Sequence, residues 1–252
     1  MLTQATIDKM HTMRMTALAE AFTRQLASSE FASLSFEERV GMMTDAEYDA
    51  REQRKLTRRL QRARLRHQAS LEDVDWQAPR GLDRQVVLSL GRCAWIREHL
   101  NLLITGPTGV GKSWLACAFA HRACRSGYSA YYVRAPRLHH DLAVARGDGS
   151  YGRLLARLAK TDLLVLDDFA LSPLKDQERR DLLEIIEDRH ERASALFTSQ
   201  LPVKSWHEAI GEATLADAIC DRLIHGAHQI ELKGASLRET SAKAKRSARA
   251  GA

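Results

Sequence analysis

The sequence of 252 residues predicts an α/β protein with a parallel five-stranded sheet, preceded by a small all-helical domain. Two observations predict the sheet: short apolar runs alternate with stretches of helical spacing, and the first of these runs leads into a glycine-rich loop. A third observation predicts the helical domain, because the first 75 residues place their apolar side chains at helix spacing.

Composition limits the class of protein. With 44% hydrophobic residues, the chain can bury one substantial core and a small second domain. The four cysteines form no C-x-x-C pair, and no apolar run approaches the roughly 18 residues of a membrane span. We therefore expect a soluble, cytoplasmic protein with no membrane partner.

Helical spacing and capping boxes divide the first 75 residues into three helices. The apolar residues of the first helix are Met15, Leu18, Phe22 and Leu26. Capping-box patterns at Ser35–Glu38 and Thr44–Glu47 then predict the starts of two further helices.

The third of these helices is strongly basic. Eight of the sixteen residues from 51 to 66 are Lys or Arg, and no acidic residue four positions on offsets them. The candidate DNA-contacting residues are Arg51, Arg54, Lys55, Arg58, Arg59 and Arg62. Such a stripe suits the phosphate backbone of duplex DNA, and a merely solvated helix face is the alternative.

Changes in composition mark the domain boundaries. Residues 1–75 are expected to form a helical domain that binds DNA or a partner. The stretch from Leu71 to Gly81 is rich in turn-forming residues, so we expect residues 76–240 to form the α/β domain. The basic tail, residues 241–252, has too few large apolar side chains to fold alone.

Five strand candidates build the sheet of the α/β domain. They are residues 101–105, 128–134, 162–169, 195–199 and 228–232. In an open parallel sheet, ligands bind at the carboxyl ends of the strands, so the loops that follow these segments are the candidate site.

The loop after the first strand carries the most specific motif. It reads Gly106, Pro107, Thr108, Gly109, Val110, Gly111, Lys112 and Ser113, and it fills every fixed position of the pattern G-x-x-x-x-G-K-[ST]. A helix follows it, and the N–H groups of such a loop and helix start bind phosphate oxygens. The sequence therefore predicts a nucleoside triphosphate site in which Lys112 reaches the β- and γ-phosphates and Ser113 ligates Mg²⁺.

Two carboxylates end the third strand candidate. Asp167 and Asp168 follow four apolar residues, and buried charge requires a partner. We expect Asp167 to hold Mg²⁺ together with Ser113, and Asp168 to orient the attacking water. The alternative is that the two acids only cap the next turn.

Three further residues complete the predicted site. Gln200, with Ser199 as second choice, follows the fourth strand and is placed to sense the γ-phosphate or to position water, unless it only closes a turn. Arg222 is a candidate arginine finger that reaches a neighbouring subunit's nucleotide, and an ion pair with Asp221 or Asp217 is the alternative. Arg238 is a second, weaker candidate for phosphate contact.

In their order, these segments resemble the IstB-like ATPases, the helper proteins encoded beside the transposase in bacterial insertion sequences. The matching segments are 58–66, 106–113, 163–169, 198–202, 206–207, 215–223 and 234–238. The resemblance implies an AAA+ fold close to the DnaC helicase loaders, ATP as nucleotide, assembly as a homo-oligomer on duplex DNA, stimulation of a partner transposase and a bacterial cytoplasm.

Three other functions stay open at this point. A DnaC-like helicase loader would share the ATPase core and use its N-terminal helices to bind a helicase. A small-molecule kinase would use the same loop, although the sequence shows no acceptor site. A scaffold that binds DNA without hydrolysis would use ATP only to order itself.

Overall fold

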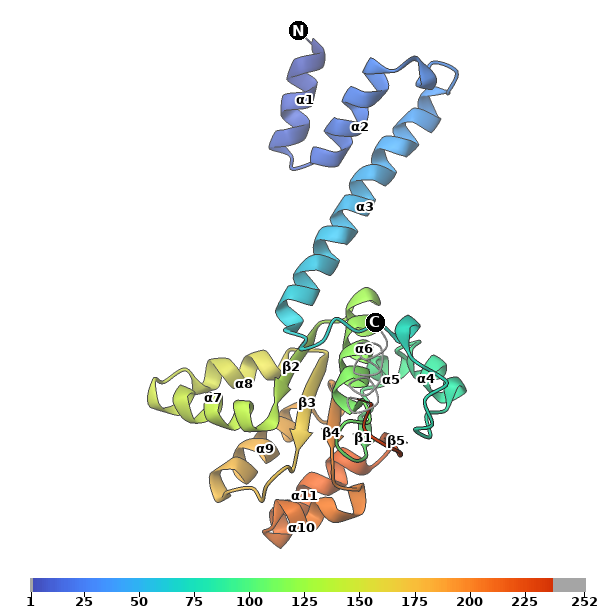
Figure 1. The fold of residues 1–252 in the computed structure, drawn as a ribbon. Coiled ribbons are helices and arrows are strands. Elements are labelled where there is room, and N and C mark those ends of the chain that lie inside the picture. Colours follow the sequence, from blue (N-terminus) through green and yellow to red (C-terminus); the bar gives the residue numbers. More distant parts are fainter. Residues whose placement is uncertain (1, 238–252) are drawn as a thin grey trace, which may run out of the picture. The chain divides into compact units, whose positions relative to one another are not determined.

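A computed structural model describes residues 2–237 (Figure 1). The chain forms two compact units, Met1–Arg58 and Arg59–Ala252. The sequence placed the boundary near residue 75, but residues 59–75 belong to the second unit, where Ala63, Ala69 and Val74 are buried. The basic tail, residues 241–252, lies outside the described residues.

The first unit is helical, as predicted. Its elements are α1 (Leu2–Thr12), α2 (Thr16–Ala27), the 3₁₀ turn η1 (Ser29–Phe31) and most of α3 (Phe36–Ala63), which continues into the second unit. The capping box at Ser35 is confirmed. The Ser35 amide donates to Glu38 Oε2 (2.8 Å), the Glu38 amide donates to Ser35 Oγ (3.2 Å), and α3 starts there.

The helix start predicted at Thr44 is wrong. Thr44 lies inside α3, and its hydroxyl donates to the Val40 carbonyl at 2.9 Å. The carboxylate of the predicted box, Glu47, instead accepts the amides of Ala17 and Leu18 at 3.0 and 3.3 Å. Glu47 therefore caps α2, a long-range partner that local spacing does not reveal.

Part of the basic stripe of α3 is paired, so the expectation that it lacks counter-charges is wrong. Glu47 lies 2.7 Å from Arg51 and 3.1 Å from Arg54, and Glu52 lies 2.7 Å from Lys55. Each acidic partner precedes its basic residue in the sequence, so a search for acidic residues four positions after the basic ones misses these pairs. Within residues 2–237, Arg58, Arg59 and Arg62 make no ion pair.

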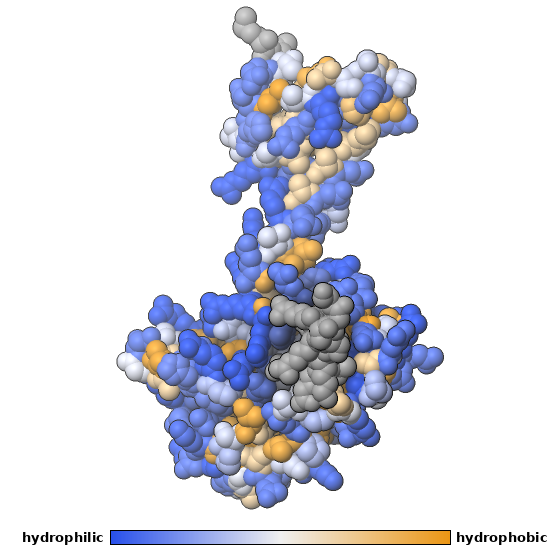
Figure 2. Space-filling view, viewed as in Figure 1, coloured by the Kyte–Doolittle hydropathy of each residue, from blue (hydrophilic) through white to orange (hydrophobic). Residues whose placement is uncertain are grey.

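Apolar side chains also interrupt the polar surface of the first unit (Figure 2). The large exposed ones are Met13, Leu26, Phe36, Val40, Met42 and Tyr48, and Phe36 is 77% exposed. This unit therefore buries its apolar residues less completely than the second unit does.

The second unit is built on the predicted parallel sheet. Its strands are β1 (Leu102–Thr105), β2 (Ala130–Arg134), β3 (Leu163–Phe169), β4 (Ser194–Ser199) and β5 (His228–Glu231). Their order is β2-β3-β4-β1-β5, and every neighbouring pair is parallel. All five strand predictions are confirmed, and the carboxyl ends of the strands meet at one edge of the sheet.

Helices cover both faces of this sheet (Figure 1). The helices and 3₁₀ turns of this unit are η2 (Leu71–Asp73), α4 (Arg84–Leu90), α5 (Ala94–Arg97), α6 (Lys112–Arg125), α7 (Ala135–Gly147), α8 (Tyr151–Ala159), α9 (Asp176–Arg189), η3 (Val203–Ser205), α10 (Trp206–Ile210) and α11 (Ala213–Ile224). Helix α6 packs on one face, and α7, α8, α9 and α11 enclose a core on the other. None of the helices in residues 2–237 is long and apolar enough to cross a membrane.

Candidate nucleotide site

A cleft of about 700 Å³ opens at the carboxyl edge of the sheet. The loop after β1 and the first turn of α6 form its floor, and residues from the ends of β2, β3 and β4 form one wall. Residues from the segment 66–80 and Leu237 line it as well. The cleft therefore lies where an open parallel sheet binds its ligand.

The backbone of the loop depends on glycine at two positions. Gly106 has φ +142° and Gly109 has φ +87°, values that other residues rarely adopt. A side chain at Gly106 would overlap the carbonyl of Leu232, and one at Gly109 would overlap Ser236. The Leu237 amide also donates to the Gly109 carbonyl at 3.0 Å. The segment after β5 thus packs against the loop and leaves no room for a β-carbon.

Lys112 begins α6 and is 7% exposed. Its ammonium donates to the carbonyls of Gly106 and Pro107 at 2.7 and 2.8 Å, so the side chain folds back over the loop. A buried cation beside a glycine-rich loop and a helix N-terminus provides a strongly positive environment for an anion. These residues fit a triphosphate.

Asp167 is fully buried at the end of β3. Three hydroxyl groups donate to its carboxylate: Ser113 Oγ at 2.8 Å, Tyr132 Oη at 2.5 Å, and Thr198 Oγ1. Burial, and then the hydrogen bond to Asp167, raise the pKa of Tyr132, which keeps that hydroxyl protonated. A carboxylate and a hydroxyl oxygen are hard donors of the kind that Mg²⁺ prefers, so the Ser113–Asp167 pair fits this ion.

Asp168 faces the cleft in an unusual backbone conformation. Its φ is +58°, and its amide donates to Thr198 Oγ1 at 3.1 Å. Its carboxylate forms an ion pair with Arg134, at the end of β2, at 2.9 Å. Asp168 therefore lines the cleft while Asp167 is buried, and Thr198 Oγ1 bonds to both residues.

Gln200 follows β4, which lies between β3 and β1. Its Oε1 accepts the hydroxyl of Thr108 in the phosphate loop at 2.8 Å. The second choice, Ser199, is buried and donates to the Phe169 carbonyl at 2.8 Å. The geometry therefore brings Gln200 to the loop and assigns Ser199 to the turn after β3.

Several residues of the cleft were not predicted from the sequence. Arg80 is 4% exposed, donates to the Asp75 carbonyl at 3.1 Å and the Val110 carbonyl at 3.5 Å, and has a pKa lowered by burial. Arg66 and Arg134 also line the cleft. Thr198 and Tyr132 carried the clearest signal, since each places a hydroxyl group near the carboxyl end of a predicted strand.

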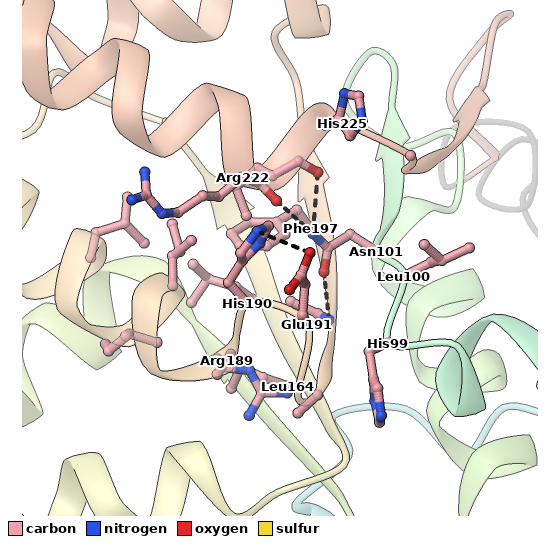
Figure 3. Close-up of a pocket in the computed structure, with 18 of the residues that line it drawn as sticks. His99, Leu100, Asn101, Leu164, Arg189, His190, Glu191, Phe197, Arg222 and His225 are labelled. Atoms are coloured by element: carbon pink, nitrogen blue, oxygen red, sulfur yellow. Dashed lines mark hydrogen bonds and ion pairs between the residues drawn. The ribbon is translucent and has the colours of Figure 1, made fainter.

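Arg222 lies at the opposite edge of the sheet, away from the cleft of its own chain. Its carbonyl and that of Leu223 accept the side-chain amide of Asn101, which precedes β1, at 3.2 Å (Figure 3). Its guanidinium pairs with Glu187 at 3.3 Å, not with Asp221 or Asp217 as the alternative expectation had it. Arg238 lies outside the described residues.

The parallel sheet, the phosphate loop and the pairing of Ser113 with Asp167 define an α/β fold of the P-loop type. The family described as IstB-like ATP binding protein matches residues 8–247. The chain belongs to this family.

Similar proteins include ATP-binding proteins of insertion sequences. One from Sinorhizobium fredii is 53% identical over 238 residues, 94% of this chain and 97% of the relative. Another, from the insertion sequence IS1162 of Pseudomonas fluorescens, is 47% identical over 203 residues, 80% of this chain and 88% of the relative.

Solved structures with a similar fold include DnaI and the DnaC helicase loader. The crystal structure of DnaI aligns with a TM-score of 0.57 at 24% identity over 66% of this chain and 91% of DnaI. The DnaC helicase loader aligns with a TM-score of 0.55 at 20% identity over 66% of this chain and 97% of the loader. At these identities the likeness concerns the fold alone.

Proposed function

We propose that this protein binds and hydrolyses ATP with Mg²⁺, assembles on duplex DNA and assists a transposase encoded by the same element. The observation that carries the proposal is the pairing of Ser113 with Asp167 beneath Lys112 and the phosphate loop. The names of the relatives support ATP as the nucleotide and an insertion sequence as the setting.

Each of these residues of the cleft has a separate role in hydrolysis. The loop amides and Lys112 bind the phosphates and stabilise the charge that develops on them. Ser113 and Asp167 would hold Mg²⁺, which when bound neutralises further negative charge. Asp168 orients the attacking water, and Gln200 reports on the terminal phosphate through its contact with Thr108.

Binding to duplex DNA is assigned to the basic stripe of α3. Arg58, Arg59 and Arg62 carry charges that no ion pair within residues 2–237 offsets, whereas Arg51, Arg54 and Lys55 share theirs with acidic neighbours. We therefore expect the end of α3 to contribute most of the affinity. Binding should weaken steeply as salt rises, because each phosphate contact releases a counterion.

Assembly would complete the ATPase. Arg222 lies far from the cleft of its own chain, at the amino edge of the sheet, and a neighbouring subunit is the partner that could bring it to a nucleotide. ATP turnover and sedimentation should be measured with and without duplex DNA. Stimulated turnover together with a larger assembly is expected, and a flat response in both would contradict the proposal.

A helicase loader is the second candidate function, favoured by the fold shared with DnaC. Affinity capture with the tagged protein separates the two. Recovery of the transposase encoded beside it supports the proposed function, and recovery of a replicative helicase in its place supports the loader.

A further inference from the structure

Arg66 links the end of the basic helix to the nucleotide site. It stands three residues after Ala63, the last residue of α3, and its side chain lines the same cleft as Lys112 and Ser113. From the sequence alone, Arg66 is only the last residue of the basic stretch 51–66. Its placement brings an exposed cation to the same cleft as the phosphate loop.

The contacts of Arg66 lead directly to the buried carboxylate. Its guanidinium interacts with the Tyr132 hydroxyl, and that hydroxyl donates to Asp167 Oδ2 at 2.5 Å. Asp167 in turn accepts Ser113, the first-turn residue of α6, at 2.8 Å. A path of three contacts therefore joins the turn after α3 to the pair of residues that fits Mg²⁺.

The turn itself is tied to the elements that carry the site. Arg64 adopts φ +52° and places its guanidinium 5.9 Å from the ring centre of Tyr131 on β2. The peptide groups of Arg66 and His67 face the thiol of Cys117, one turn beyond Ser113 on α6. Earlier in the chain, the charge of Arg59 reaches Cys124 of α6. The turn that follows α3 thus contacts both β2 and α6, the helix that follows the phosphate loop.

We propose that Arg66 contacts the terminal phosphate of a bound triphosphate and so couples the nucleotide to the last turn of α3, where Arg59 and Arg62 bind DNA. This inference rests on the proposed function. A diphosphate lacks the group that would draw the guanidinium from Tyr132 into the cleft. The arrangement of Arg59 and Arg62, and with it the affinity for DNA, then depends on the nucleotide state.

The test compares Arg66→Ala with Arg64→Ala. The two variants lose the same charge from the same turn, but Arg64 does not line the cleft. For each protein, the dissociation constants of a non-hydrolysable ATP analogue and of ADP are measured first. The affinity for a fluorescent duplex is then measured with each nucleotide bound. Arg66→Lys, which keeps the charge, should recover part of any loss.

We expect Arg66→Ala to weaken binding of the triphosphate analogue about tenfold while leaving ADP affinity within about twofold, since a charge-assisted contact is worth roughly that much. The ratio of DNA affinities in the two nucleotide states should fall to near one. Arg64→Ala should keep both preferences. Unchanged preferences in Arg66→Ala, or equal losses in both variants, would overturn the inference.

The outcome also separates this inference from the proposed function. If the unmodified protein binds neither ATP nor DNA, the proposed function fails and the coupling fails with it. If it binds both but Arg66→Ala behaves as the unmodified protein does, only the role of Arg66 is wrong.

Discussion

The two edges of one sheet use polar side chains in different ways. At the carboxyl edge, Asp167, Asp168 and Gln200 bond to other side chains around an open cleft. The cations Lys112 and Arg80 of the same cleft bond to main-chain carbonyls. At the amino edge, Asn101 and Arg189 bond to main-chain groups of neighbouring segments.

The amino edge also encloses a cavity of about 370 Å³ with a largely apolar lining (Figure 3). At the amino edge these bonds satisfy buried main-chain groups and hold segments of the fold together, whereas the polar side chains of the carboxyl edge surround an opening that a ligand can enter.

Arg222 is the exception that tests this comparison most severely, because it lies at the amino edge and is assigned a role at a neighbour's cleft. Arg222→Ala should lower turnover of the DNA-bound assembly about 10³-fold, by analogy with other arginine fingers, while ATP binding stays within about twofold. Single-turnover assays at saturating ATP measure the effect.

Glu187→Ala is the matched control for Arg222, since it removes the ion-pair partner and keeps the guanidinium. Turnover should be preserved in that variant. An equal loss for Arg222→Ala in isolated subunits and in assemblies would mean that the arginine acts within its own chain.

Asp168 tests the carboxyl edge itself. Asp168→Asn keeps the size of the side chain and removes the charge that pairs with Arg134. Turnover should fall about 10²-fold or more, the usual contribution of a residue that orients the attacking water, with nucleotide affinity nearly unchanged. Turnover at the unmodified rate would exclude this role and favour a scaffold in which ATP only orders the protein.

Arg189 tests the amino edge. It is 3% exposed and donates to four carbonyls, those of Leu158, Thr161, Asp162 and Ser194. Arg189→Ala removes all four of these bonds from a buried position, so we expect a loss of about 3 kcal/mol in the free energy of unfolding. All four tryptophans lie in the second unit, and their fluorescence in urea follows its unfolding alone. If Arg189→Ala is as stable as the unmodified protein, the side chains of the amino edge do not hold the fold together as described.

Glu47 gives the smallest effect and extends the comparison to the first unit. Burial raises its pKa, but the hydrogen bonds from Arg51, Leu18 and Ala17 outweigh burial and hold the pKa below its usual value of 4.5. Its stabilisation is therefore complete at neutral pH and is lost as the pH falls through the lowered pKa.

Glu47→Gln should cost about 1 kcal/mol at pH 7, typical of a lost helix cap. Hydrogen exchange in residues 16–27, corrected for intrinsic rates, measures the change at pH 7 and at acid pH. The difference between the two proteins should shrink at acid pH. A difference that does not depend on pH would contradict the capping role.

The sequence predicted the sheet fully and the site in part, and the reasons are physical. Strands, the phosphate loop and the acids that end β3 are local patterns, and parallel strands bring their ends together without further information. Glu47 and Arg80 depend on partners about 30 residues away, and Arg134 meets Asp168 only because β2 and β3 are neighbours. Contacts of that kind require the fold.

The boundary between the two units shows the same limit. A run of turn-forming residues near position 75 is a local signal, but burial of Ala63 and Ala69 places the division earlier in the chain. Helix α3 therefore crosses from one unit to the other, which no change in composition marks.

The cleft at the carboxyl edge is proposed to be an ATP site, and binding of a fluorescent ATP analogue to the unmodified protein and to Lys112→Ala tests this assignment directly. We expect saturable, Mg²⁺-dependent binding that weakens at least about 10²-fold in Lys112→Ala, the cost of removing a preorganised charge from a buried site, with the unfolding transition largely kept. Equal affinity in both proteins would contradict the claim.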